Sequence, residues 1–250
     1  MMQRLLVCTA ICFTSAAACS AQDDFWIGAF GWLGDFQSSI ATPQDENSVN
    51  LGSDLQYDPI IGVPYVKFQA TVNRRWYVRG EYWATEQTSR TVLARDVQLD
   101  GTTFNAGESV SSRYLIQVGE GSLLYVFYRE SGFRLSGIQG FNVLNFQMHM
   151  ENAAQSDAVN FTVATAPFGV MVEYDFLPDL TVQGLVVGIP TLGANERTTM
   201  VMADLLAIYR FAPYSALGVG YKAFWFSSES PVQDFRYRLA GPYAGFIFRF

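Results

Sequence analysis

The sequence ends in Tyr243-Ala244-Gly245-Phe246-Ile247-Phe248-Arg249-Phe250, and this stretch decides the fold. Aromatic residues recur at alternate positions up to the last one, whereas soluble domains commonly end in a poorly ordered polar tail. Residues two apart in a β-strand point to the same face. The stretch therefore predicts a strand that presents a row of phenylalanines on one face.

The same period of two recurs upstream. Val66, Phe68 and Ala70 alternate with Lys67 and Gln69, so one face is apolar and the other is polar. Similar alternation is found at 78–84, 164–175, 201–211 and 217–225. The charged residues on the polar faces are Lys67, Arg79, Glu81, Glu173, Asp204, Arg210 and Lys222. Alternation with charge on a single face is typical of membrane β-strands.

Three segments, 25–38, 111–129 and 133–147, are rich in apolar residues but show no clear phase. Gly119-Glu120-Gly121 lies in the second of them. Glycine inside a strand often marks a bulge or a bend, so we expect an irregularity at this point.

Membrane-spanning helices are excluded by the distribution of hydrophobic residues. Half of the chain is hydrophobic and 15% is aromatic. After the first 21 residues, however, no apolar stretch has the roughly 18 residues that a spanning helix needs. Segment 180–192 contains Gln183 and Pro190, and segment 200–212 contains Asp204 and Arg210. Since lipid admits only helices or closed barrels, the sequence predicts an all-β barrel.

The connections predict the topology. Tight turns are expected at Asn73-Arg74-Arg75, Glu130-Ser131-Gly132, Pro178-Asp179 and Pro213-Tyr214. Longer polar links are expected at 41–62, 89–110, 148–157, 191–198 and 227–233. Short and long links alternate, as they do in transmembrane barrels. Five long and four short links join ten strands into a single antiparallel up-and-down barrel. An eight-stranded barrel with one hairpin outside it is the alternative.

The N-terminal residues have the organisation of a secretory signal peptide. Arg4 is followed by an apolar core at 5–13 and by small residues at 18–21. We expect cleavage after Ala21, which divides the chain into a signal peptide, 1–21, and a barrel, 22–250. Lipidation of Cys19 is the alternative. All three cysteines, Cys8, Cys12 and Cys19, lie in the removable segment, so the mature chain is expected to contain no disulfide.

The C-terminal stretch resembles the insertion signal of bacterial outer-membrane β-barrels, with Tyr243, Gly245, Phe248 and Phe250 at its positions. The mature chain resembles a small barrel of this class at the level of fold. The resemblance implies a location in the bacterial outer membrane, with both termini in the periplasm. It also implies contact with outer-membrane lipid and lipopolysaccharide. Periplasmic chaperones and the barrel-insertion machinery are the partners expected during assembly.

Charge and residue usage exclude several functions. Without Arg4 the chain has 15 basic and 23 acidic residues, a formal charge of −8, so we expect no nucleic-acid binding. One histidine and no mature cysteine exclude the usual zinc ligand sets, and no cofactor motif is present. The predicted loop acids are Asp45, Glu46, Asp54, Asp58, Asp96, Asp100 and Glu108. Calcium binding or cation bridging to lipopolysaccharide is possible chemistry for them, but a solvated acidic rim is the preferred interpretation.

His149 is the single candidate for imidazole catalysis. It begins a predicted outer link, with Glu151, Ser156 and Asp157 near it in sequence. Hydrolases combine a nucleophile, a base and an orienting carboxylate, and these residue types could supply all three. No catalytic motif is matched, however, so a solvated histidine is the preferred interpretation and an enzyme is not expected.

The charged residues of the polar faces predict an internal network. Four are basic and three are acidic, so they can pair across a narrow lumen and offset the cost of burial. A plug is the preferred interpretation and a pathway for a ligand or ion is the alternative. Three functions follow in order of preference: a structural or surface-binding barrel with long outer loops, a narrow channel for small solutes, and a lipid-modifying or proteolytic enzyme at the outer rim.

Overall fold

The computed structural model describes residues 25–41, 49–189, 197–229 and 234–250. The predicted signal peptide with its three cysteines, and the loop acids Asp45 and Glu46, lie outside these ranges. The strands are β1 (Phe25–Ala41), β2 (Val49–Asn50), β3 (Ile60–Thr71), β4 (Trp76–Val92), β5 (Val97–Leu99), β6 (Thr102–Phe104), β7 (Ser109–Glu130), β8 (Phe133–Glu151), β9 (Ser156–Thr165), β10 (Phe168–Leu177), β11 (Leu180–Ile189), β12 (Arg197–Ala212), β13 (Ser215–Glu229) and β14 (Asp234–Arg249). No helix in the described ranges is long and apolar enough to cross a bilayer.

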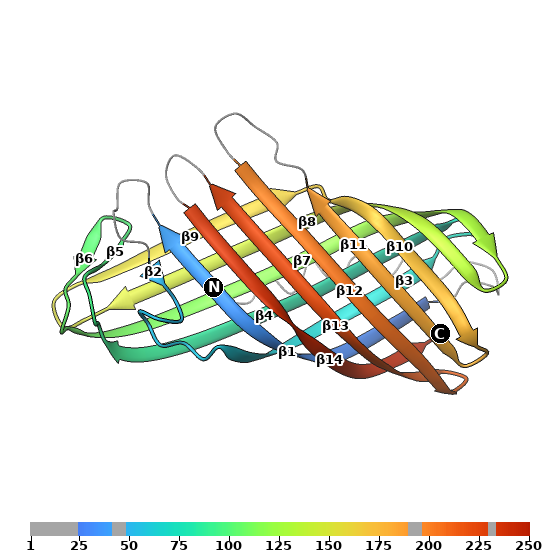
Figure 1. Ribbon diagram of the computed structural model, residues 1–250, viewed down its shortest axis with the longest axis horizontal. Helices are drawn as coiled ribbons and strands as arrows, with labels where there is room; N and C mark the ends of the chain where they lie inside the picture. Colours follow the sequence, from blue (N-terminus) through green and yellow to red (C-terminus); the bar gives the residue numbers. More distant parts are fainter. Residues whose placement is uncertain (1–24, 42–48, 190–196, 230–233) are drawn as a thin grey trace.

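The strands form a closed antiparallel barrel (Figure 1). β14 pairs with β1, and β8 pairs with β9 along one half and with β10 along the other, so β9 and β10 together make a single stave. The staves are therefore β1, β3, β4, β7, β8, β9 with β10, β11, β12, β13 and β14. The predicted all-β, up-and-down barrel of ten strands is confirmed in place of the eight-stranded alternative.

A proline divides the stave made by β9 and β10. Pro167 has no N–H to give to the ladder, so the strand is interrupted there. Its carbonyl oxygen still accepts a hydrogen bond from the Gly140 N–H at 2.7 Å, and a weaker one from the Gln139 side-chain amide at 3.4 Å. These bonds keep the barrel wall closed at the interruption.

The short turns gather at the end of the barrel where β14 ends (Figure 1). Ser131 and Gly132 have φ angles of 46° and 83°, the left-handed conformation that a two-residue hairpin turn of the primed type requires. Asn73 fixes another turn, because its side-chain oxygen accepts the N–H groups of Arg75 and Trp76 at 2.9 and 3.1 Å. The sequence thus encodes these turns locally.

Two expectations about connections and irregularities need correction. The link expected at 148–157 is only residues 152–155, because β8 and β9 continue their pairing as far as Glu151 and Ser156. The bulge expected at Gly119–Gly121 is also wrong. β7 pairs continuously with both neighbours there, and its register shift with β8 lies between Val126 and Tyr128.

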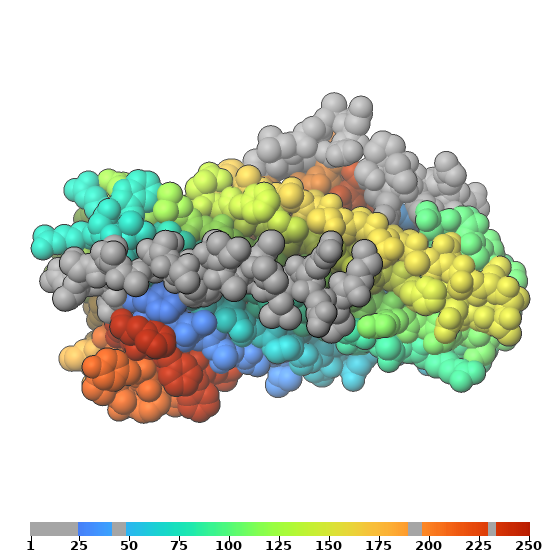
Figure 2. Space-filling view, turned by 180° about the vertical axis from the view of Figure 1, so that it is seen from behind, coloured from blue at the N-terminus to red at the C-terminus, as the bar shows by residue number. Residues whose placement is uncertain are grey.

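The long-link end carries an ordered cover. Within the link between β4 and β7, β5 and β6 form a small hairpin sheet. Five apolar side chains of the links are fully buried: Leu51, Leu55, Val97, Leu99 and Phe104. Arg95 also forms an ion pair with Asp54 at 2.5 Å and ties the two links together. Seen from behind, the green and yellow part of the chain forms this end of the elongated molecule (Figure 2).

Candidate functional site: the charged lumen

The structure gathers five of the seven predicted lumen charges at the centre of the barrel. Lys67 comes from β3, Arg79 and Glu81 from β4, Asp204 from β12 and Lys222 from β13. All five are buried, and Lys222 is 0% exposed. Their positions alternate with outward-facing residues of the same strands, which is why the period-two pattern could place them on the inner face.

The ion pairs of this central cluster cross the lumen. Asp204 accepts from the Lys67 ammonium at 2.5 Å and from the Arg79 guanidinium at 3.1 Å through the same carboxylate oxygen. Its other oxygen accepts the Tyr243 hydroxyl at 2.6 Å. Glu81 pairs with Lys222 and, at 3.4 Å, with Arg79. The cluster offsets the large cost of burying each of these charges, because every one has a partner of opposite sign.

Aromatic rings surround the two lysines. The Lys67 ammonium lies 5.8 Å from the centre of the Tyr65 ring and 5.6 Å from that of Tyr243. The Lys222 ammonium lies 5.7 Å from Trp32 and 5.2 Å from Tyr65. Rings at these distances stabilise a desolvated cation through their quadrupoles. The centre of the lumen is therefore filled by paired charges and rings.

Glu120 also belongs to this layer, and the sequence did not reveal it. Its side chain is 8% exposed and points inward from β7, where its register partners are Glu81 on β4 and Asn142 on β8. The phase of β7 is ambiguous in the sequence because Ile116 and Val118 on the inner face are as apolar as many outward residues. With Glu120 the central cluster has three basic and three acidic side chains.

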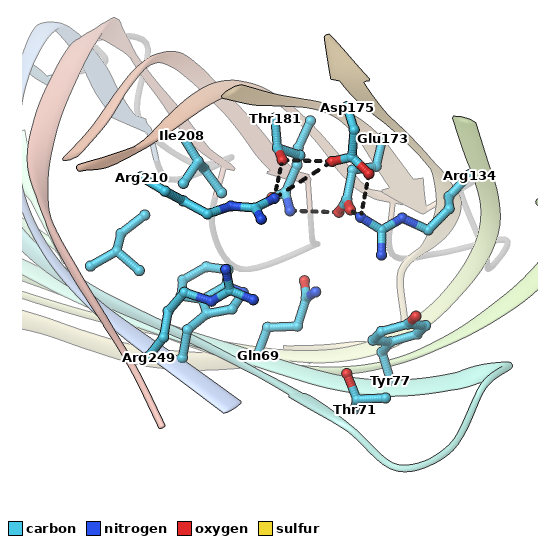
Figure 3. A pocket seen from close by; sticks show the side chains of 13 residues that line it. Gln69, Thr71, Tyr77, Arg134, Glu173, Asp175, Thr181, Ile208, Arg210 and Arg249 are labelled. Atoms are coloured by element: carbon cyan, nitrogen blue, oxygen red, sulfur yellow. Dashed lines mark hydrogen bonds and ion pairs between the residues drawn. The ribbon is translucent and has the colours of Figure 1, made fainter. Parts of the chain in front are cut away.

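The remaining two predicted charges, Glu173 and Arg210, lie in a separate group nearer the short turns (Figure 3). Arg210 donates to the Thr181 hydroxyl at 2.8 Å and lies 3.7 Å from Asp175. Glu173 pairs with Arg134, a residue in one of the segments of ambiguous phase. Below this group is a cavity of about 230 Å³. The predicted single network is thus two groups, one central and one beside a cavity.

Between the central cluster and the long-link end, the lumen is occupied by stacked aromatic side chains. Trp83 packs edge-on against Trp32 and Phe224, with ring centres 5.7 and 5.5 Å apart. Nearer the mouth, Tyr57 from a long link packs against Tyr114 at 4.9 Å, and its hydroxyl donates to Ser112 at 2.8 Å. Burial raises the pKa of Tyr57 to about 12. These contacts fix the link over the mouth.

His149 lies away from all of these groups. It belongs to the outward face of β8, and its imidazole nitrogen is 3.4 Å from the Glu151 carboxylate, with both side chains about half exposed. Ser156 and Asp157 follow on β9, in register with Glu151 and Met150. The arrangement is that of an exposed histidine on a strand surface.

The loop acids within the described ranges serve the loops themselves. Asp58 and Asp96 accept backbone N–H groups, and Glu108 accepts hydrogen bonds from Asn105 and Asn152. The bonds from Asn105 lower the pKa of Glu108. Among the described residues, no group of three or more histidine, cysteine, aspartate or glutamate side chains could hold a metal ion.

The residues of the predicted insertion signal close the barrel. Phe248 and Phe250 point outward, whereas Tyr243 points into the lumen. The Phe250 ring is 5.6 Å from that of Phe25, and its N–H donates to the Phe25 carbonyl at 2.9 Å. The end of the chain is therefore part of the seam between β14 and β1.

No protein-family model matches the sequence, and no curated protein matches it. Solved structures do match. The outer membrane protease OmpT from Escherichia coli is 10% identical, with a TM-score of 0.59 over 92% of this chain and 97% of that one. The chain has the fold of a bacterial outer-membrane β-barrel. The translocator domain of the autotransporter NalP from Neisseria meningitidis has a TM-score of 0.46 at 10% identity, covering 98% of this chain and 95% of that one. Ail of Yersinia pestis has 0.36 at 10% identity, covering 91% and 97%.

Proposed function

We propose that this barrel resides in the bacterial outer membrane with a closed lumen, and that it acts through its ordered outer end as a structural or surface-binding protein. One observation carries the proposal. Paired charges at the centre, stacked rings above them and buried link residues at the mouth occupy successive levels of the lumen. A barrel filled in this way offers no continuous water path, and its function then depends on its outer surfaces.

The distribution of outward side chains supports an orientation with the long links outside the cell. Leu33 on β1 is 60% exposed, and Asp35 and Gln37 follow it toward the long links. Tyr82 on β4 is likewise followed by Glu86. An apolar band next to the short turns and a polar wall beyond it match a barrel that rises above the outer leaflet. Both ends of the described chain then face the periplasm.

Lipopolysaccharide is the partner that the outer wall supports best. Arg236 and Arg238 point outward from β14, beside Gln37 on β1 and above the half-exposed ring of Trp225. Arg238 is 12 residues from the end of the chain. At roughly 3.3 Å per residue and about 40° of tilt, it stands roughly 30 Å above that end, at the upper edge of the bilayer. Arginines bind phosphate in a bidentate manner, and an aromatic belongs at this interface.

A conductance recording tests the closed lumen. We expect the refolded mature chain to insert into planar bilayers and to show little steady current. A large and stable open channel would overturn the closed-lumen proposal and favour transport of small solutes. The rim enzyme has no support from the position of His149, whose contacts on the outer face lack a nucleophile.

Binding to lipopolysaccharide is tested separately. We expect lipopolysaccharide to raise the thermal unfolding temperature of the refolded barrel more than phosphatidylglycerol does. Arg236→Ala with Arg238→Ala should remove most of that difference. Arg90→Ala is the matched control, because Arg90 also points outward but stands higher, at the outer end of β4. An equal response of wild type and double variant would contradict this partner.

A further inference from the structure

The cavity nearer the short turns has two chemically different walls (Figure 3). On one wall, Arg134 and Arg210 are paired with Glu173 and Asp175. The side chains of Arg210 and Asp175 remain 31% and 34% exposed, so solvent reaches this wall. Since its charges are matched within the wall, it is a preformed polar surface that requires no ligand.

The opposite wall is built by a row of three neighbours. Trp26 on β1 is in register with Gln69 on β3 and with Arg249 on β14, and all three line the cavity. Residues directly opposite each other on adjacent strands have their Cβ atoms roughly 5 Å apart. An amide and a guanidinium therefore flank one indole ring on the same wall.

Gln69 is the residue that points to a ligand. It is 7% exposed, and its side-chain oxygen has no hydrogen-bond partner among the described residues. Buried polar groups are nearly always paired, because an unpaired one has lost its hydration without compensation. The amide reaches into the cavity beside Arg249 (Figure 3). A molecule in the cavity would supply the missing bond.

The charge and the apolar residues of the cavity define the class of ligand. Three arginines and two carboxylates line it, which leaves a formal charge of +1. Ile208 and Ile247, both buried, line it together with Trp26 and provide an apolar surface. The volume of about 230 Å³ equals that of several water molecules. The cavity thus suits a small molecule with one negative charge and a short apolar part.

We propose that this cavity binds a small organic monocarboxylate, held by the Arg249 guanidinium and the Gln69 amide and packed on Trp26, Ile208 and Ile247. The carboxylate meets the guanidinium, and the amide group turns its N–H toward the second carboxylate oxygen. The chain of the ligand then lies along the apolar residues. The assignment does not depend on which end of the barrel faces the cell surface, or on binding of lipopolysaccharide.

Titration calorimetry of the refolded mature chain in a non-ionic detergent tests the assignment. Hexanoate is the probe, and hexylammonium and inorganic phosphate are its comparisons. We expect saturable binding of one hexanoate, weaker binding of phosphate and no binding of hexylammonium. Arg249→Gln should weaken hexanoate binding about tenfold or more, since a charge-assisted contact is lost. Gln69→Leu, which cannot donate, should weaken it as well.

Arg74→Gln is the matched control, because Arg74 lies exposed in a short turn at the same end of the barrel. It should bind hexanoate as the wild type does. Circular dichroism establishes that each variant has folded. Lack of saturable hexanoate binding to the folded wild type would overturn the proposal. Equal binding of hexylammonium, phosphate that binds as tightly as hexanoate, or an unchanged affinity in Arg249→Gln would overturn it too.

Discussion

Lys67 and Asp204 form an ion pair of 2.5 Å although 137 residues separate them in sequence. Lys67 is on β3 and Asp204 on β12, and β13, β14 and β1 stand between these strands along the wall. Four steps around a ring of ten staves place the two residues on nearly opposite sides. The pair therefore spans the lumen and holds two distant parts of the wall together.

The pair is expected to be costly to break from one side. Asp204→Leu leaves Lys67 and Arg79 buried without their shared partner, so we expect a loss of about 3–5 kcal/mol in the free energy of unfolding. The double variant Lys67→Met with Asp204→Leu should lose less than the sum of the single losses. Urea unfolding in lipid vesicles measures all three. Additive losses would show that the two residues do not interact.

Arg79 and Arg210 are expected to contribute independently, since they belong to different groups. Arg79→Ala removes a buried partner of Asp204 and Glu81, and about 3–5 kcal/mol should be lost. Arg210 is one-third exposed, so Arg210→Ala should cost no more than about 1 kcal/mol. The double variant should equal the sum within about 0.5 kcal/mol. Strong non-additivity in urea unfolding would indicate a single network.

The orientation can be examined by thiol labelling in intact cells. Ser53→Cys and Ala106→Cys place thiols on exposed positions of the long links, and Arg74→Cys places one in a short turn. We expect a membrane-impermeant reagent to label the first two variants only. Cells with a permeabilised outer membrane are the control, in which all three should react. Labelling of Arg74→Cys alone in intact cells would reverse the orientation.

Tyr57 predicts a change of stability with pH. Its folded pKa of about 12 is above the unfolded value of 10.0, so the folded state favours the neutral phenol. Its contribution is complete below pH 10 and is lost as the pH rises from 10 to 12, by about 2–3 kcal/mol. Tyr57→Phe keeps the ring but cannot ionise. The difference in unfolding free energy between wild type and variant should shrink over this interval, and a constant difference would contradict the burial of the hydroxyl.

Deletion of Phe250 separates the insertion signal from the stability of the seam. If the terminal aromatic is read by the insertion machinery, cells should accumulate the truncated chain as protease-sensitive periplasmic material. The same chain should still refold into detergent, because β14 keeps its other pairings with β1 and β13. Equal failure in detergent would assign the effect to the lost Phe25–Phe250 contact. Normal outer-membrane yield would contradict the signal.

The parts of the fold that could be predicted are those where the two faces of a strand differ in chemistry. Lys67 and Glu81 alternate with Val66 and Tyr82, so membrane and lumen are easily distinguished in β3 and β4. The turn residues Ser131-Gly132 likewise mark a hairpin in the sequence alone. Both signals are local, and ten strands followed from them.

The phase of β1 could not be predicted because its inner face is also apolar. Trp32 and Phe36 fill the lumen, while Gly31 and Leu33 face outward, so hydrophobicity does not distinguish the sides. The same difficulty in β7 concealed Glu120. Which charges meet was beyond the sequence as well, because that depends on how far around the ring two strands lie. For this reason Arg79 and Arg210 looked like members of one network.

The long sequence separations inside the central cluster have a consequence for assembly. Lys67 meets Asp204 across 137 residues, and Glu81 meets Lys222 across 141, so no single hairpin satisfies either pair. An open sheet that entered the lipid before β14 reached β1 would carry these charges without partners, at great cost. Only the closed ring relieves that penalty. The cluster thus acts as a checkpoint that makes half-assembled barrels unstable and couples entry into the membrane to completion of the seam.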